Sequence, residues 1–332
     1  MIALYIGQNN AGSTSGMRAR ALQKLLNPGA FTLIDTHVPM QETAPLFRSL
    51  GFRTNRGPLI AKVNQAIENK LGSWYDLIWV DKANFITPEI TRLLRSRTAL
   101  LVHFTPDCAF YSNQSHLFEK SIPYYDWFIS SKSFERQYYP AEKLIEITQG
   151  YDPGVHLPVS DVGCKTRDVC FIGLYEKSRG DMVDVLLGAN IQVALGGMGW
   201  KKCKNLHHPK VEYLGEKVFG SHYAEALGSS RFGLGLLSKH FPELHTTRTF
   251  EIPACGTALI TERNTDTTRF FTEEEVIFYD SLLEIPDKII HLTNNLPALE
   301  RITQNGYRKV TDGMYSYEKI LKEVLERIIP VR

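Results

Sequence analysis

Residues 77–104 read LIWVDKANFITPEITRLLRSRTALLVHF and contain the pattern that decides the fold. The continuous apolar run Leu77–Val80 is followed by a helical segment at Pro88–Leu94, which begins with proline as first turns permit. A second apolar run follows at Leu100–Phe104. Continuous apolar strands separated by helices are typical of a parallel sheet that is covered on both faces. The segment therefore predicts a β-α-β unit of an α/β protein.

The same alternation continues on both sides of this segment. Before residue 150 the expected strands are 2–6, 31–34, 77–80, 100–104 and 127–129, with helices at 17–26, 59–71 and 88–94 and an irregular stretch between 34 and 59. From residue 169 the expected strands are 169–172, 193–195, 211–214, 233–237, 258–260 and 277–279. The helices expected there are 180–187, 224–227, a short one near 250, 285–292, 296–309 and 315–329. Between the two blocks, Gly150–Pro158 contains two glycines and two prolines and is typical of a linker.

The two blocks predict an α/β protein of two doubly wound, Rossmann-like domains that face a central cleft. The length of 332 residues agrees with two domains of about 150 residues each. Open α/β sheets bind ligands outside the carboxyl ends of their strands. The residues that follow the strands are therefore the candidates for chemistry.

Composition and charge exclude several classes of protein. Hydrophobic residues make up 43% of the chain and charged residues 22%, which is an ordinary globular balance. The chain contains 38 Lys and Arg and 36 Asp and Glu, which gives a net charge of +2. This charge is too small for a protein that holds nucleic acid mainly by neutralising its phosphates, and it leaves open a local basic cleft. The five cysteines are scattered without a C-x-x-C pair, as expected of reduced thiols in a cytoplasmic protein. We find no signal peptide and no apolar run of roughly 18 to 20 residues, so we expect any membrane contact to be peripheral.

The stretch most informative about chemistry is ELHTTRTFEIPACGTALITE, residues 243–262, which follows the strand expected at 233–237. Thr246, Thr247 and Thr249 are possible N-caps of the short helix there. The free amides around Thr246 to Arg248 would bind an anion beside the guanidinium group of Arg248. One turn further, the carboxylate of Glu251 can accept hydrogen bonds from the two vicinal hydroxyls of a ribose. Together these groups predict a site for a nucleotide with a diphosphate.

This stretch resembles the donor-binding motif of GT-B-type glycosyltransferases, in which two glutamates are separated by seven residues, as Glu243 and Glu251 are. The segment from Arg248 to Thr261 is more closely similar to the spore-maturation-protein-like branch of these enzymes (glycosyl transferases group 1). In that branch an Arg-x-Phe-Glu segment leads to a glycine and a strand. Weaker similarity touches most of the chain.

The resemblance implies a role for each domain. Residues 1–158 would bind the acceptor, residues 159–314 would bind the nucleotide-sugar donor, and a C-terminal helix at about 315–332 would pack back on the first domain. Glu251 would hold the ribose, and Glu243 would face the sugar or the phosphates. The other donor-binding residues would be Arg248, His245, Thr246, Thr247, Lys177 and Arg179, the last two facing the diphosphate. Because related enzymes need no essential metal and no Asp-x-Asp signature occurs, we expect neither a metal nor a cofactor.

The base that deprotonates the acceptor hydroxyl is expected in the first domain. Asp81 and Asp107 follow strand ends, and His103 lies near the end of an apolar strand. The sequence leaves the choice among the three open.

The predicted function is the transfer of a sugar from a nucleoside-diphosphate sugar to a hydroxyl of a saccharide or glycoconjugate acceptor, as in the synthesis of polysaccharides, glycoconjugates or surface structures. Two alternatives stay open: a nucleotide-sugar epimerase of the same fold, and a non-catalytic assembly protein that binds nucleotide or glycan. An NAD-dependent oxidoreductase is disfavoured because the loop Gly7–Gly16 lacks the G-x-G-x-x-G spacing.

Overall fold

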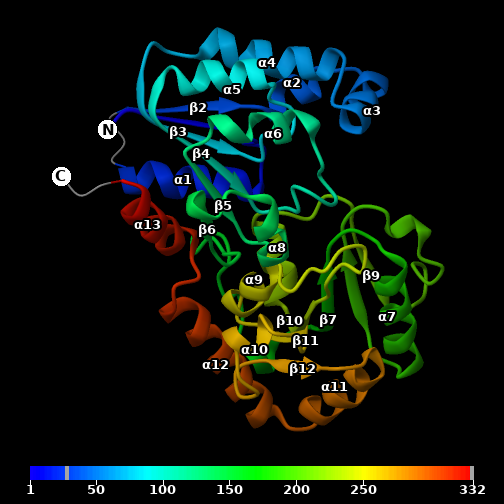
Figure 1. Cartoon of the computed structure of the whole chain (residues 1–332). Helices are drawn as coiled ribbons and strands as arrows, with labels where there is room; N and C mark the ends of the chain where they lie inside the picture. Colours follow the sequence, from blue (N-terminus) through cyan, green and yellow to red (C-terminus); the bar gives the residue numbers. More distant parts are fainter. Residues whose placement is uncertain (27–29, 330–332) are drawn as a thin grey trace. The chain divides into compact units, whose positions relative to one another are not determined.

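The computed structural model describes residues 1–26 and 30–329 and divides the chain into two compact units. Unit 1 consists of Met1–Thr148 together with the C-terminal helix α13 (Tyr317–Ile328), and unit 2 consists of Gln149–Ser316. Each unit contains a six-stranded parallel sheet flanked by helices (Figure 1), so the predicted α/β architecture is confirmed. Residues 330–332 of the predicted C-terminal helix lie outside the described part of the chain.

The sheet of unit 1 has the strand order β2-β1-β3-β4-β5-β6. Its strands are β1 (Ala3–Gly7), β2 (Phe31–Asp35), β3 (Tyr75–Asp81), β4 (Thr98–Thr105), β5 (Trp127–Ser130) and β6 (Leu144–Glu146). The connections reverse direction between β1 and β3, so the two strand ends there flank a crevice at the carboxyl edge of the sheet.

The sheet of unit 2 has the order β12-β11-β10-β7-β8-β9. Its strands are β7 (Arg167–Ile172), β8 (Val193–Gly196), β9 (Val211–Gly215), β10 (Ser230–Gly235), β11 (Ala258–Glu262) and β12 (Ile277–Tyr279). This is the order of a dinucleotide-binding Rossmann sheet, and the reversal point lies between β7 and β10. Loops that follow these two strands are therefore well placed to hold a ligand.

The helices agree with most of the predicted ones. They are α1 (Thr14–Leu26), α2 (His37–Gln41), α3 (Pro45–Thr54), α4 (Pro58–Lys70), α5 (Pro88–Arg95) and α6 (His116–Ser121) in unit 1, and α7 (Lys177–Gly188), α8 (Ser221–Gly228), α9 (Arg248–Ala254), α10 (Thr267–Phe270), α11 (Ile285–Thr293) and α12 (Leu296–Asp312) in unit 2. The stretch between 34 and 59 was expected to be irregular, which is wrong because it contains α2 and α3. Helix α3 buries only Gly51, so its sequence lacks the buried apolar stripe by which a surface helix is recognised. None of the helices in the described residues is long and apolar enough to cross a membrane.

A buried ion pair connects the elements of unit 1. The side chains of Arg18 on α1 and Asp81 at the end of β3 are both fully buried, with 2.8 Å between Nη2 and Oδ2. The hydroxyl of Tyr5 on β1 donates to the same carboxylate oxygen at 2.8 Å. The guanidinium carbon of Arg18 lies 4.5 Å from the ring centroid of Phe104 on β4 and 5.5 Å from that of Tyr317 on α13. The ion pair of Arg18 and Asp81 therefore joins two helices and three strands, and Figure 1 shows α13 beside α1.

Removal of one partner of this pair should strongly destabilise the protein. We expect Asp81→Asn to lower the free energy of unfolding by about 3–5 kcal/mol, because it leaves the Arg18 charge buried without a counter-ion. Urea unfolding measures the change. The matched control is Lys24→Ala, since Lys24 and Glu318 form an ion pair whose side chains are 70% and 37% exposed, and such surface pairs contribute at most about 1 kcal/mol. Equal losses in the two variants would contradict the central role of Arg18.

Candidate functional site

Two arginines meet at the reversal point of the second sheet. Arg179 lies in the first turn of α7, which follows β7, and Arg248 is the first residue of α9, which follows β10. The guanidinium carbon of each lies 5.4 Å from the ring centroid of Phe171 on β7. The structure thus brings together two of the residues that the sequence predicted to bind the donor.

Each of the two guanidinium groups has an N–H donor without an acceptor among the described residues. Arg179 forms an ion pair with Glu176 at 3.1 Å, whereas Arg248 donates to the main-chain oxygens of Leu236 at 3.2 Å and Ile172 at 3.5 Å. Within the described residues Arg248 has no carboxylate partner, and the buried Nε atoms of both arginines have no acceptor. Burial and the neighbouring charge of Arg248 lower the pKa of Arg179 to about 10. An anion placed here would relieve this repulsion and accept the unused donors.

The carboxylate of Glu251 lies one helical turn after Arg248 and is almost completely buried. Its Oε2 accepts hydrogen bonds from the hydroxyls of Tyr223 at 2.6 Å and Thr247 at 3.0 Å. Its Oε1 faces Nε2 of His156 at 3.6 Å. Burial and the carboxylate of Glu251 raise the pKa of Tyr223, so the phenol keeps its proton and donates. Three side chains therefore fix the orientation of this carboxylate.

The loop before α9 is held by its own contacts. Because the amide of Gln149 donates to Nε2 of His245 at 3.1 Å, the proton of this imidazole is on Nδ1, which lies 2.7 Å from Oδ2 of Asp266. Both ring nitrogens are thus occupied within the protein, and His245 positions the loop. The amide of Thr246 donates to Oγ1 of Thr249 at 3.1 Å, so the prediction that this amide is free for an anion is wrong.

Two further predicted donor-binding residues differ in their placement. The partly exposed Glu243 accepts a hydrogen bond from the amide of Ser238 at 3.3 Å, and its charge acts on Arg179. The side chain of Lys177 is 86% exposed and pairs with Asp181 on its own helix at 2.9 Å. Glu243 therefore belongs to the arginine cluster, whereas Lys177 is not brought to it.

Backbone loops approach this cluster closely. Gly197, in the loop after β8, has φ +115°, and a Cβ atom there would lie 2.2 Å from the carbonyl oxygen of Gly173, in the loop after β7. A Cβ at Gly173 would in turn lie 3.2 Å from Nη1 of Arg248. Only glycine at position 197 permits this close contact between the two loops.

Unit 1 has a cavity of about 100 Å³ at the reversal point of its own sheet. Its polar lining includes Gln8 after β1, Lys82 and Asn84 after β3, and Asp107 after β4. Lys82 and Asp107 form an ion pair of 2.6 Å, and their side chains are 34% and 39% exposed. The cavity therefore presents a carboxylate and an ammonium group that solvent can reach.

The chain that leaves β3 is strained where it enters this cavity. Lys82 has φ +76° and the next residue, Ala83, has φ +49°, although neither is glycine. A non-glycine residue in this region costs about 1–3 kcal/mol and persists only where neighbouring structure enforces it, most often at functional sites. The strain turns Lys82 toward Asp107, so the backbone conformation supports the assignment of a site here.

The three candidate bases have very different surroundings. Asp81 is fully buried in its ion pair with Arg18. His103 is buried in an aromatic cluster, with its ring 4.2 Å from that of Phe118, and burial lowers its pKa to about 3. Asp81 and Asp107 both line the cavity of unit 1, but the side chain of Asp81 is 0% exposed and that of Asp107 is 39% exposed. Burial tends to raise the pKa of Asp107, but the adjacent ammonium of Lys82 outweighs it and holds this pKa below its usual value.

Comparisons with known proteins agree with this architecture. A family model described as glycosyl transferase-like matches residues 179–326. HepE of Anabaena, in complex with UDP and glucose, aligns with a TM-score of 0.68 at 16% identity over 100% of both chains. Sucrose-phosphate synthase of Thermosynechococcus elongatus aligns with a TM-score of 0.67 at 14% identity over 98% of each chain. The fold is GT-B.

The family match and the GT-B neighbours support a glycosyltransferase, although sequence comparison with curated proteins gives no match. A glycosyltransferase of Rickettsia africae has the same fold, with a TM-score of 0.62 at 12% identity over 98% of this chain and 97% of its own. The similarity to the spore-maturation-protein-like branch remains a prediction.

Two residues that contact Glu251 escaped the sequence analysis. His156 lies in the segment interpreted as a linker, and Tyr223 lies on α8, yet both contact Glu251. Tyr223 is 28 residues from Glu251 in sequence, and His156 is further away, so no local spacing could indicate either contact.

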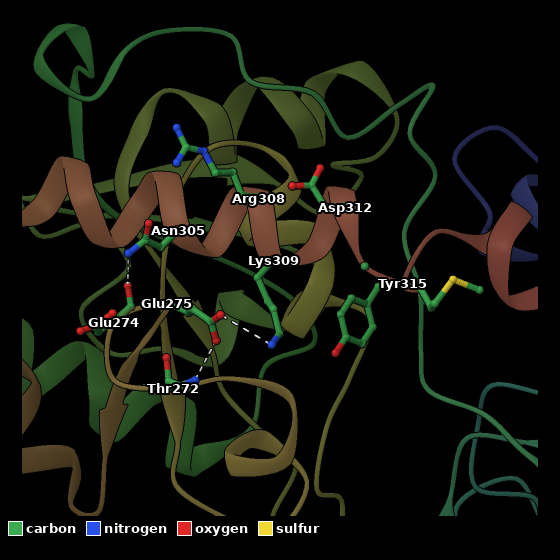
Figure 2. Close-up of a pocket in the computed structure, with 10 residues that line it drawn as sticks. Thr272, Glu274, Glu275, Asn305, Arg308, Lys309, Asp312 and Tyr315 are labelled. Carbon is green, nitrogen blue, oxygen red and sulfur yellow. Dashed lines mark hydrogen bonds and ion pairs between the residues drawn. The ribbon is translucent and has the colours of Figure 1, made fainter.

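Unit 2 has a pocket of about 650 Å³ between α12 and the segment that enters β12 (Figure 2). Two of its charged groups pair with each other, since Nζ of Lys309 lies 3.5 Å from Oε1 of Glu275, and Glu275 also accepts from the amide of Thr272 at 2.8 Å. Arg179, Arg248 and Glu251 are not among the residues that line this pocket. No group of three or more His, Cys, Asp and Glu in the described residues could hold a metal ion.

The burial of His103 predicts a pH dependence of stability. An unfolded histidine takes up a proton near pH 6.5, whereas His103 in the folded chain does so only near pH 3. Between these values the unfolded state binds more protons, so His103 makes the free energy of unfolding fall as the pH falls. We expect His103→Phe to reduce this decline between pH 6.5 and 4.5 in urea unfolding. His240→Phe, at an exposed histidine, is the control, and equal slopes in wild type and His103→Phe would contradict the assignment.

Proposed function

We propose that this GT-B protein is a glycosyltransferase that transfers a sugar from a nucleoside-diphosphate sugar to a hydroxyl of a saccharide or glycoconjugate acceptor. One observation carries the proposal: Arg248 has no carboxylate partner among the described residues and lies beside Arg179, one turn before the buried carboxylate of Glu251. A nucleoside diphosphate has the complementary groups, since its diphosphate suits the arginines and its ribose hydroxyls suit the glutamate. Solved structures of HepE contain UDP and UDP-glucose, which makes UDP the first nucleotide to test.

On this proposal Arg248 and Arg179 neutralise the charge that develops on the diphosphate as it leaves. Fixed cations that are already oriented lower the barrier because they need no reorganisation during the reaction. They would perform the task that a metal ion performs elsewhere, so the transfer would be metal-independent. Oε1 of Glu251 is the oxygen proposed for the ribose, because Oε2 already accepts two hydrogen bonds. Glu243 would contact the transferred sugar.

Asp107 is the proposed base in unit 1. The acceptor oxygen forms a bond to the anomeric carbon while the bond from that carbon to the diphosphate oxygen breaks, and the nucleoside diphosphate leaves with the electron pair. Asp107 takes the proton of the acceptor hydroxyl. Lys82 keeps Asp107 ionised, which is the state that a base requires. The cavity beside this pair is proposed to receive the acceptor of a polysaccharide, glycoconjugate or surface-structure pathway.

Replacement of donor-site residues should separate diphosphate binding from ribose binding. We expect Arg248→Gln to weaken binding of both UDP and inorganic pyrophosphate by about 10- to 100-fold, because a charged hydrogen bond contributes about 1.5–3 kcal/mol. Glu251→Gln should weaken UDP by a similar factor and leave pyrophosphate unchanged. Isothermal titration calorimetry measures both affinities.

The exposed Lys177→Gln is the control and should bind both ligands like the wild type. If wild-type protein binds none of UDP, GDP, dTDP, CDP and ADP, the proposed donor site is wrong. A donor incubated alone distinguishes the alternatives, since an epimerase would isomerise its sugar. An assembly protein would bind the donor without transfer to any member of an acceptor panel.

The proposed base makes a different prediction. We expect Asp107→Asn to lower kcat by about 100- to 10,000-fold, which is the usual contribution of a general base. The affinity for UDP should stay unchanged because Asp107 lies in unit 1. Release of UDP from the sugar nucleotide that binds, in the presence of a saccharide panel, measures kcat. A variant with full kcat would show that another group takes the proton.

A further inference from the structure

Helix α3 exposes an apolar face that the proposed chemistry does not use. The side chains of Leu46, Phe47 and Leu50 are exposed, at 77%, 45% and 46%. Residues at positions i, i+1 and i+4 lie on one side of a helix. The helix is held against α4 at Gly51, which packs so closely on Leu59 that a Cβ would lie 2.7 Å from it, and its other side carries Phe52, whose ring packs edge-on against Phe85. The helix is therefore mounted with its apolar side outward, which is the reverse of an ordinary surface helix.

The segment that contains this face carries a net positive charge. Residues 37–63 contain four Lys and Arg (Arg48, Arg53, Arg56 and Lys62) and one acidic residue, Glu42, which leaves +3 in this segment against +2 for the whole chain. The side chains of the three arginines form no ion pair within the described residues, and Nζ of Lys62 donates to the main-chain oxygen of Glu42 at 2.9 Å. The apolar face is thus accompanied by arginines that no carboxylate of the described chain neutralises.

We propose that the α3 face, defined as Leu46, Phe47 and Leu50 with the neighbouring arginines, docks on an anionic lipid bilayer. A helix that lies in a bilayer interface buries its apolar side chains among the acyl chains while its basic residues contact lipid phosphates. The face is a convex helix at the periphery of unit 1, beyond α2 and α4 (Figure 1). A bilayer can cover such a surface without a matching groove, and its negative charge complements the unpaired arginines.

The docking face adjoins the cavity of unit 1. Phe52 belongs to α3, lines that cavity and packs edge-on against Phe85, with 4.8 Å between the ring centroids. A bilayer bound to α3 therefore lies beside the place proposed for the acceptor, which favours an acceptor carried on a lipid. This consequence rests on the proposed function, whereas the docking itself does not.

Vesicle flotation with the full-length chain tests the proposal. The probes are vesicles of phosphatidylcholine alone and of phosphatidylcholine with phosphatidylglycerol at a 3:1 ratio. We expect binding to the anionic vesicles that weakens as salt is added. Leu46→Ser with Leu50→Ser should weaken this binding by at least about tenfold. The combination of Arg48→Gln, Arg53→Gln and Arg56→Gln should weaken it by about 100-fold, from roughly fivefold for each arginine.

The control variant is Leu283→Ser, which removes an equally exposed leucine (73%) from unit 2 and should float like the wild type. Absence of binding to anionic vesicles, or unchanged binding by the serine variant, overturns the proposal. It is also overturned if the wild type sediments as a dimer and the serine variant as a monomer, because the face would then join two copies of the chain. UDP affinity measured on the same variants separates the two proposals, since docking can fail while the donor site remains intact.

Discussion

The ion pair between Arg18 and Asp81 is closed off from water, and the carboxyl edge of the first sheet depends on it. Asp81 is the last residue of β3, so fixing its carboxylate also fixes the point at which the chain leaves the sheet. The next two residues then accept the left-handed conformation, and the first of them, Lys82, reaches Asp107. The ion pair buried at the end of β3 thus stabilises the strained turn at Lys82 and Ala83. This turn then positions the polar residues that line the cavity.

The two units differ in the charge that they place at the same topological position, the reversal point of the strand order. At the reversal point of unit 1 a cation and an anion neutralise each other, as Lys82 and Asp107 do, so the local charge is balanced and a carboxylate stays ionised. At the reversal point of unit 2 two guanidinium groups share one aromatic ring, and among the residues that the structure describes only Arg179 has a carboxylate partner, Glu176. The first arrangement suits the movement of a proton, whereas the second attracts an anion.

The sequence predicted what depends on local pattern. Strands buried on both faces are continuous apolar runs, so nearly all of them were found. Arg248 and Glu251 were identified because both lie in one short segment. The sequence could not predict what depends on distant partners. Asp81 and Asp107 both follow strands, and only the fold reveals that Asp81 is held in an ion pair by Arg18, 63 residues away. Helix α3 was missed because its leucines face outward, so no buried stripe marks it.

Helix α13 follows all of unit 2 in the chain and yet completes unit 1. Its buried residues run from Tyr317 to Ile328 along one face, and Tyr317 lies over the guanidinium group of Arg18. During synthesis on the ribosome, α1 and the first sheet emerge early, but the helix that covers them is made only after unit 2 has been translated. Unit 1 is therefore begun first and finished last, and in the interval the nascent chain carries an uncovered apolar flank. The complete fold of unit 1 therefore requires the synthesis of unit 2 as well.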